Sequence, residues 1–139
     1  MTAYRVEAVA PDDDDVSLVE RELRAFNRGA LGDYAYEPLA FVLRGPRGEV
    51  AGGVDGLTGL GWLHVATLWV DDAARGLGHG RALLLAAEGE ARRRGCHGSY
   101  LFTFDFQAPS FYRATGYETF GVLEDFPPGM RRWFLRKAL

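Results

Sequence analysis

Hydrophobic and polar residues alternate with a period of two along parts of this chain, and elsewhere apolar residues recur three or four positions apart. The first pattern is typical of strands and the second of amphipathic helices. Glycine and proline clusters between the runs mark turns. The strands predicted in this way are Ala3–Val9, Leu39–Leu43, Glu49–Val54, Trp62–Val70, Ser99–Thr103, Tyr117–Val122 and Arg132–Arg136.

The first predicted helix follows the acidic run Asp12 to Asp15 and should end near Gly29. Aspartate side chains accept hydrogen bonds from the free N–H groups of a first helical turn, and their charge complements the helix dipole. We therefore interpret the acidic run as a helix cap and not as a functional cluster. The apolar residues of this helix are Val16, Val19, Leu23 and Phe26.

A second helix is predicted between Gly80 and Gly95, and a short third one between Pro109 and Gly116, because proline suits a first helical turn and glycine a helix end. The basic residues before Gly95 complement the dipole of the second helix at its carboxyl end. The apolar stripe expected on this helix is Leu83, Leu84, Ala87 and Ala91. Charged residues expected away from the stripe are Arg81, Glu88, Arg92 and Arg93.

The order of these elements predicts an α/β domain built on a mixed sheet. The early strands are joined by the turn-rich segments Arg44–Gly48 and Asp55–Gly61, which favours antiparallel pairs. A helix then joins Trp62–Val70 to Ser99–Thr103, and such a crossover places two strands parallel. No repeat or linker is visible, so residues 1–139 are expected to form one domain.

Composition narrows the class of protein. The chain has 139 residues, of which 47% are hydrophobic and 25% charged, as in a soluble globular domain. Its net charge of -3 argues against a nucleic-acid binder. Neither a signal peptide nor an apolar run long enough for a membrane span is present, and we expect a cytoplasmic protein with no membrane partner.

The cysteine and the histidines give little support to other chemistry. Cys96 is the only cysteine, which excludes an internal disulfide, and we interpret it as a small core residue. His64, His79 and His97 lack the spacing of metal ligands, so no metal is predicted.

The segment between Val70 and Arg81 predicts an anion site. Gly76, Gly78 and Gly80 leave the backbone accessible directly before a helix, whose free N–H groups attract phosphate. A Walker loop would require Gly-Lys-Ser/Thr, but Gly80 is followed by Arg81. A dinucleotide site would require an acidic residue about 20 positions on, at the end of the next strand, and none stands there.

This loop resembles motif A of the GNAT superfamily of acyl-CoA-dependent N-acetyltransferases, Arg/Gln-x-x-Gly-x-Gly/Ala, which is present here as Arg75, Gly78 and Gly80. A second motif of the family is a short helix ending in Tyr-x-x-x-Gly-Phe/Tyr after the next strand. Tyr112, Gly116 and Tyr117 match it. One departure is Asp105, where many members have asparagine.

The resemblance implies the GNAT fold, with a central, mostly antiparallel sheet and a parallel strand pair at the cofactor site, and acetyl-CoA as co-substrate. It places the thioester carbonyl against the backbone N–H groups of Leu68 and Val70, and gives Tyr112 the role of general acid toward the CoA sulfur. The residues that it assigns to cofactor binding are Leu68, Trp69, Val70, Arg75, Gly76, Leu77, Gly78, His79, Gly80, Arg81, Asp105, Phe111 and Tyr112.

The expected reaction is direct attack of a primary amine, from a small molecule or peptide, on acetyl-CoA. The general base is left open: His64 titrates near neutrality, Glu37 and Glu118 are alternatives, and a water relay is sufficient for many amines. The segment from Gly29 to Pro38 either lines an acceptor pocket with its tyrosines or is an ordinary exposed loop.

Two other functions are compatible with these motifs. One is a non-catalytic acyl-CoA-binding module, and the other is an interaction protein with a GNAT-like fold. The presence of Tyr112 favours the enzyme. The apolar run Trp133-Phe134-Leu135 further predicts a homodimer, unless that strand is buried within one monomer.

Overall fold

The computed structural model describes residues 3–139 and divides the chain into two compact units, Met1–Tyr34 and Ala35–Leu139. The first unit contains helix α1 (Asp14–Leu31). Asp13 is its N-cap and accepts a hydrogen bond of 2.8 Å from the backbone N–H of Asp15, as the acidic run predicted. The helix ends at Leu31, two residues beyond the end expected near Gly29, and its C-cap Gly32 adopts a φ of 71° that favours glycine.

The strand predicted over Ala3–Val9 is wrong. Residues 3–10 have no regular secondary structure, and the side chains of Tyr4 and Val6 are fully exposed. A strand is stable only when a neighbour satisfies its backbone hydrogen bonds, and no other strand pairs with this segment in the described part of the chain. Loose alternation alone therefore overstated the strand signal here.

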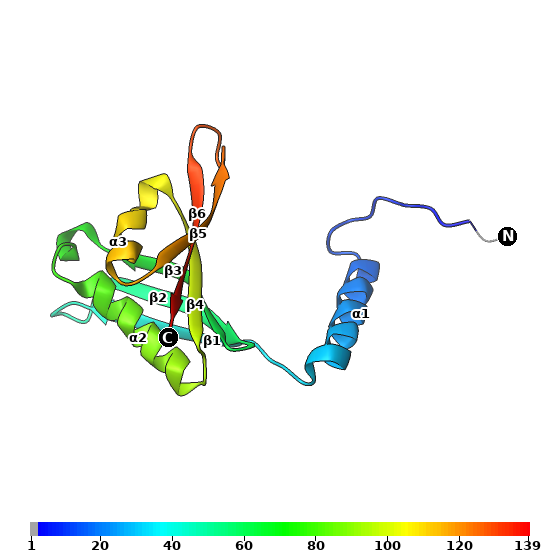
Figure 1. Cartoon of the computed structure of the whole chain (residues 1–139), viewed down its shortest axis with the longest axis horizontal. Helices are drawn as coiled ribbons and strands as arrows, with labels where there is room; N and C mark the ends of the chain where they lie inside the picture. The colour runs from blue at the N-terminus through cyan, green and yellow to red at the C-terminus, as the bar shows by residue number, and fades with distance from the viewer. Residues whose placement is uncertain (1–2) are drawn as a thin grey trace. The chain divides into compact units, whose positions relative to one another are not determined.

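The second unit is built on a six-stranded sheet with the order β1-β2-β3-β4-β6-β5, shown in Figure 1. β3 and β4 are parallel and every other neighbouring pair is antiparallel, which confirms the predicted mixed sheet. The strands are β1 (Glu37–Arg44), β2 (Val50–Gly59), β3 (Trp62–Val70), β4 (Gly98–Phe104), β5 (Glu118–Glu124) and β6 (Arg131–Ala138).

Strand β2 continues through the segment that the sequence predicts as a turn. It ends at Gly59, and only Leu60 and Gly61, both with positive φ, form the hairpin to β3. Gly56 is required inside the strand, because a Cβ there would lie 2.2 Å from the carbonyl oxygen of His64. The glycine that suggested a turn therefore permits a close approach of two strands.

Helix α2 (His79–Arg93) packs against β1, β2 and β3 and supplies one side of the core. The predicted stripe of Leu83, Leu84, Ala87 and Ala91 is buried, as the helical periodicity predicted. Glu88 was expected away from this stripe, and that expectation is wrong: its side chain is fully buried. It faces Lys137 and Tyr117, which provide the hydrogen bonds that a buried carboxylate requires.

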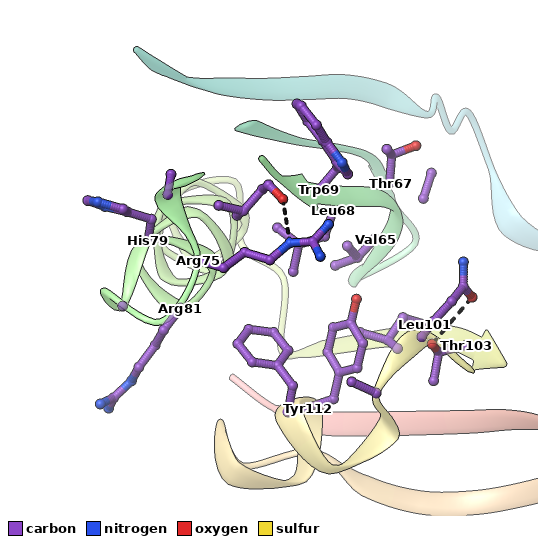
Figure 2. Close-up of a pocket in the computed structure, with 18 of the residues that line it drawn as sticks. Val65, Thr67, Leu68, Trp69, Arg75, His79, Arg81, Leu101, Thr103 and Tyr112 are labelled. Carbon is purple, nitrogen blue, oxygen red and sulfur yellow. Dashed lines mark hydrogen bonds between the residues drawn. The ribbon is translucent and has the colours of Figure 1, made fainter. Parts of the chain in front are cut away.

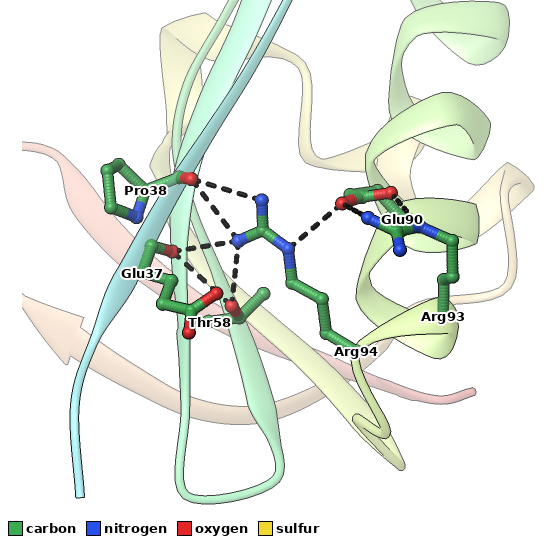
Figure 3. A network of polar contacts seen from close by, with 6 residues as sticks. All are labelled: Glu37, Pro38, Thr58, Glu90, Arg93 and Arg94. Carbon is green, nitrogen blue, oxygen red and sulfur yellow. Dashed lines mark hydrogen bonds and ion pairs between the residues drawn. The ribbon is translucent and has the colours of Figure 1, made fainter.

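Arg94 joins the end of α2 to the start of the sheet, as Figure 3 shows. Its guanidinium donates hydrogen bonds to the backbone carbonyls of Glu37 and Pro38 and to Oγ1 of Thr58, and it forms an ion pair of 3.0 Å with Glu90. Arg93 also bonds Glu90. These two members of the basic run therefore have a structural role, in agreement with the sequence interpretation.

Candidate active site

The site begins where the parallel strands separate. The ladder between β3 and β4 pairs Trp62 with Gly98, Leu63 with Ser99, and His64 with Tyr100, and it extends no further along the described strands. On the other side, the register between β2 and β3 shifts so that Ala66 has no partner. This bulge increases the twist of β3 just where β4 leaves it. The two strands thus open into a wedge after His64.

Backbone N–H groups of β3 point into this wedge. The N–H of Asp71, directly after β3, donates to Ala51 in β2 at 2.8 Å. Successive residues of a strand point their N–H groups to opposite edges, so those of Leu68 and Val70 point away from β2 and toward the wedge. Since β4 has separated from β3 there, these donors face open space.

The glycine loop lies beside the wedge and leads into α2. A short 3₁₀ helix, η1 (Asp72–Ala74), precedes it, and Gly76 and Gly78 have φ values of 76° and 85° that favour glycine. Gly78 is the N-cap of α2 and provides no side-chain hydrogen bond, so the first N–H groups of the helix have no side-chain cap. Such an end attracts an anion through both its donors and its dipole.

The wedge, the loop and the short helix α3 (Pro109–Ala114) surround a cavity of about 890 Å³, seen in Figure 2. Most of the predicted cofactor residues line it. They are Leu68, Trp69, Val70, Arg75, Gly76, Gly78, His79, Gly80, Arg81, Phe111 and Tyr112. Leu77, Asp105 and His64 are not among the lining residues.

Tyr112 projects from α3 into this cavity, and Figure 2 shows its hydroxyl pointing toward β3. Pro109 stands at the start of the helix, where its missing N–H costs nothing. The ring of Tyr112 packs edge-on against Phe111, at 5.1 Å between centroids. Burial raises the pKa of the Tyr112 phenol, which keeps it protonated at neutral pH.

His64 lies apart from the cavity lining, between aromatic side chains of β4. Its ring stacks on Tyr100 at 4.8 Å and lies 5.5 Å from Phe102. Burial lowers the pKa of His64, and this outweighs an opposing interaction with the backbone of Tyr100. Its Nδ1 is buried and has no hydrogen-bond partner within residues 3–139. Burial thus favours the neutral form of His64, which lies outside the cavity that Tyr112 lines.

Asp105 is held by β6. One of its carboxylate oxygens accepts a hydrogen bond of 2.6 Å from the indole N–H of Trp133, and the other accepts one of 2.7 Å from the backbone N–H of Arg131. The bond from Trp133 is the main reason that the pKa of Asp105 is lowered. Where the family often has asparagine, this chain thus uses a carboxylate to fix the segment between β4 and α3.

Sequence reasoning missed several lining residues that follow β4. Gln107 in η2 (Asp105–Gln107) accepts a hydrogen bond of 3.1 Å from the backbone N–H of Phe104, and Ala108 has a positive φ of 59° before α3 begins. Phe106 lines the cavity as well. The one available signal was their position between the strand and Pro109, since loops at the ends of parallel strands commonly form ligand sites.

Two further properties concern the described residues as a whole. None of the helices in residues 3–139 combines the length and the apolar character that a membrane crossing requires. Over the same residues, histidine, cysteine, aspartate and glutamate side chains form no group of three suited to a metal ion.

Comparison with known proteins agrees with this geometry. The model of the acetyltransferase (GNAT) family matches residues 6–117. Blasticidin-S acetyltransferase of Streptomyces morookaense is 49% identical over 104 residues, which are 74% of this chain and 76% of that protein. The chain belongs to the GNAT family of acetyltransferases. It is accordingly an acetyltransferase, and the two non-catalytic alternatives are set aside.

Solved structures share its fold. The crystal structure of an acetyltransferase from Bacillus cereus superposes with a TM-score of 0.90 at 33% identity and covers 98% of both chains. An aminoglycoside 6'-N-acetyltransferase solved with coenzyme A superposes with a TM-score of 0.68 at 20% identity, over 73% of each chain. The second likeness shows the fold alone, and the bound coenzyme A is a property of that protein.

Proposed function

We propose that this enzyme transfers the acetyl group of acetyl-CoA directly to a primary amine of a small molecule or peptide. One observation carries the proposal: the uncapped start of α2, the N–H groups of Leu68 and Val70, and the phenol of Tyr112 belong to one cavity. Since the family model spans residues 6–117, from the first unit into the second, both units are proposed to belong to one acetyltransferase domain.

The cavity has a suitable partner for each charge that the reaction requires. The amine lone pair forms a bond to the thioester carbonyl carbon, the C–S bond breaks with its electrons on sulfur, and one ammonium proton leaves to water. The thiolate is then protonated, which gives an amide and free CoA. The glycine loop is suited to the pyrophosphate, and the N–H groups of Leu68 and Val70 to the oxyanion.

Tyr112 is proposed as the hydrogen-bond donor and general acid at the leaving sulfur. What supports this role is its place in the cavity: Tyr112 projects into it with its hydroxyl toward β3, and the phenol, whose pKa burial raises, is protonated at neutral pH and can donate a hydrogen bond to the thiolate. His64, Glu37 and Glu118 do not line the cavity, so a relay of water molecules is the proposed route for the amine proton. Glu118 is also engaged in an ion pair of 3.1 Å with Arg136.

The acceptor is proposed to approach from a second, more open depression of about 520 Å³ beside the bulge of β3. Ala66, at the bulge of β3, lines both this depression and the larger cavity, and we propose that the amine reaches the thioester past this residue. Asp55 lines the depression and is exposed, and its carboxylate is suited to a cationic amine. Replacing Asp55 by Asn should raise the KM of such an acceptor and leave that of acetyl-CoA unchanged.

The relative from Streptomyces morookaense makes blasticidin S the first acceptor to test. The purified protein is mixed with acetyl-CoA and blasticidin S, and both free thiol and the mass of the product are followed. Thiol release matched by an acetylated product supports the proposal. If acetyl-CoA produces no thermal stabilisation, the cofactor assignment is wrong; if it stabilises the protein but a panel of amines gives no product, amine transfer is wrong.

A further inference from the structure

A polar cluster of four residues does not belong to the lining of the cavity. Glu88 is fully buried, and its two carboxylate oxygens accept hydrogen bonds of 2.8 Å from Nζ of Lys137 and 3.1 Å from the hydroxyl of Tyr117. The Tyr117 hydroxyl also lies 2.8 Å from Oγ of Ser99. We call these four residues the Glu88 network. They come from α2, β4, the residue directly before β5, and β6.

The network reaches the carbonyl groups that end α3. Lys137 donates a second hydrogen bond of 2.8 Å, to the backbone carbonyl of Thr115. The hydroxyl of Thr115 and the backbone N–H of Tyr117 both donate to the carbonyl of Tyr112, at 2.8 and 3.0 Å. Lys137 is thus connected to the backbone of Tyr112 through one intervening residue, Thr115. The ring of Tyr117 also meets that of Tyr112 edge-on at 6.0 Å.

The same cluster holds the helix that follows the glycine loop. Glu88 lies in the middle of α2, and the N-terminus of α2 is the proposed pyrophosphate site. The ion pair of Glu88 with Lys137 therefore couples the helix that carries the phosphate site to the helix that carries Tyr112. A ligand whose pyrophosphate binds at α2 and whose thioester reacts beside α3 requires a fixed distance between these two helices.

If these positions served only to stabilise the fold, apolar residues would do so at a lower cost in desolvation free energy. Burying a charged pair requires desolvation of both partners, and well-packed apolar replacements are often at least as stable. A hydrogen-bonded ion pair has a defined geometry that apolar packing lacks, because each hydrogen bond fixes the position of its partner group. The Lys137 ammonium is also specific in its geometry, since it bonds Glu88 and the Thr115 carbonyl together.

We propose that Glu88 and Lys137 are positioning residues for acetyl transfer, which hold the α3 backbone so that the Tyr112 hydroxyl stays at the reacting sulfur. This inference rests on the proposed function of Tyr112. Neither residue touches the cofactor or the acceptor in it; both act through Tyr112. Loss of the pair should therefore slow the chemical step more than it weakens the binding of acetyl-CoA.

The test is a double-mutant cycle between Lys137→Met and Tyr112→Phe. Methionine keeps an unbranched stem but removes both hydrogen bonds of the ammonium. Lys137→Met alone should lower kcat about 10-fold or more, while the KM of acetyl-CoA changes less than about 3-fold. In the Tyr112→Phe background the same substitution should cost less than about 3-fold, because the proton donor that it misplaces is already absent.

Arg136→Met is the matched control. Arg136 is the neighbour of Lys137 in β6, but it pairs with the exposed Glu118 and does not contact the Glu88 network in the described structure. Its kcat should equal that of the parent. If Lys137→Met does not fold, Glu88→Gln takes its place, since it preserves the shape of the side chain and removes only its charge; the expected pattern of the cycle is the same, with a smaller loss.

Each result decides the proposal. If Lys137→Met causes an equal loss of kcat in both backgrounds, its role is generally structural and the proposal is overturned. An unchanged kcat in Lys137→Met would overturn the proposal as well. A Tyr112→Phe enzyme as fast as the parent would overturn the general-acid role itself, and the positioning role with it. That last failure is recognised from Tyr112→Phe alone, so it cannot be confused with the other two.

Discussion

Nε of Arg75 donates a hydrogen bond of 2.8 Å to the backbone carbonyl of Val70, and this bond closes the glycine loop onto the end of β3. The guanidinium also forms an ion pair with Asp72 in η1. Val70 is one of the two residues whose N–H groups point into the wedge. Arg75 thus acts on two parts of the site together: it shapes the loop, and it fixes the end of the strand whose N–H groups are proposed as oxyanion donors.

Replacing Arg75 by Met should therefore weaken acetyl-CoA binding without unfolding the protein. The hydrogen bond to Val70 and the ion pair with Asp72 are lost, the loop loses its fixed entry into α2, and we expect the Kd of acetyl-CoA to rise about 10-fold. Isothermal titration calorimetry measures it. Arg92→Met, at the exposed end of the same helix, is the control and should bind as the parent does. Equal affinity of the two variants would contradict this role of Arg75.

A substitution at Gly80 tests how closely the loop must approach the proposed acetyl-CoA. A Cβ at this position would lie 3.3 Å from Cζ of Phe111, so even a small side chain presses on a residue that lines the cavity. Gly80→Val should abolish measurable stabilisation by acetyl-CoA while the circular dichroism spectrum stays that of the parent. Gly89→Ala is the matched control, because nothing lies within 4 Å of a Cβ there. A folded Gly80→Val protein with parental affinity would remove the phosphate-loop assignment.

Local signals were sufficient for much of this site. The bounds of β3 follow from the apolar run Trp62–Val70, and the parallel pairing of β4 from the helix between the two strands. Gly78 and Gly80 predict an anion site from the sequence alone, because the need for glycine is a property of the backbone itself, and this site stays a prediction. Tyr112 was found only through the second motif, since nothing local distinguishes a cavity tyrosine from one in the core.

Features that depend on distant partners could not be predicted. Glu88 is buried because Lys137, 49 residues further along the chain, neutralises it, and helical periodicity contains no information about that pairing. The strand predicted over Ala3–Val9 failed for the same reason: the hydrophobic alternation is present, but no neighbouring strand in the described part of the chain pairs with this segment. Asp105 is a third case: its partner Trp133 lies 28 residues away and directs the carboxylate to β6.

The ion pairs of Glu90 near the carboxyl end of α2 predict that the folded protein is less stable in acid. Hydrogen bonds from Arg93 and then Arg94 lower the pKa of Glu90 from 4.5 to about 2. A carboxylate with a lowered pKa contributes stability above its unfolded-state value, and this contribution is lost as the pH falls from about 4.5 toward 2. Glu90→Gln should therefore have a lower Tm than the parent at neutral pH, and the two Tm values should approach each other as the pH falls toward 2. A difference independent of pH would contradict this assignment.

The homodimer predicted from the last apolar run stays a prediction. Leu135 is fully buried within the sheet, whereas Trp133 and Phe134 are half-buried, and Arg131 lies over the Trp133 ring at 4.9 Å. Light scattering at tens of micromolar protein is expected to report a mass about twice that of one chain. A monomer at that concentration would show that β6 is adequately covered by its own chain, and it would leave the proposed chemistry unchanged.

Tyr112→Phe separates a catalyst from a protein that only binds acetyl-CoA. Phenylalanine preserves the ring and its edge contact with Phe111 but cannot donate a hydrogen bond to sulfur. We expect the Kd of acetyl-CoA to stay within about 3-fold of the parent and kcat to fall by about 10² to 10⁴. Steady-state kinetics with a competent amine and calorimetry with acetyl-CoA measure the two quantities separately.

The leaving group provides the control for this role. An acetyl donor whose thiol is more acidic releases its thiolate with less help, so the loss caused by Tyr112→Phe should shrink with that donor if the phenol acts at sulfur. A loss that is the same for both donors would place Tyr112 at another step, such as the orientation of the amine. Because burial raises the pKa of Tyr112, its deprotonation should end activity only at a pH above the ordinary range for tyrosine. The Tyr112→Phe enzyme should lack that alkaline limb.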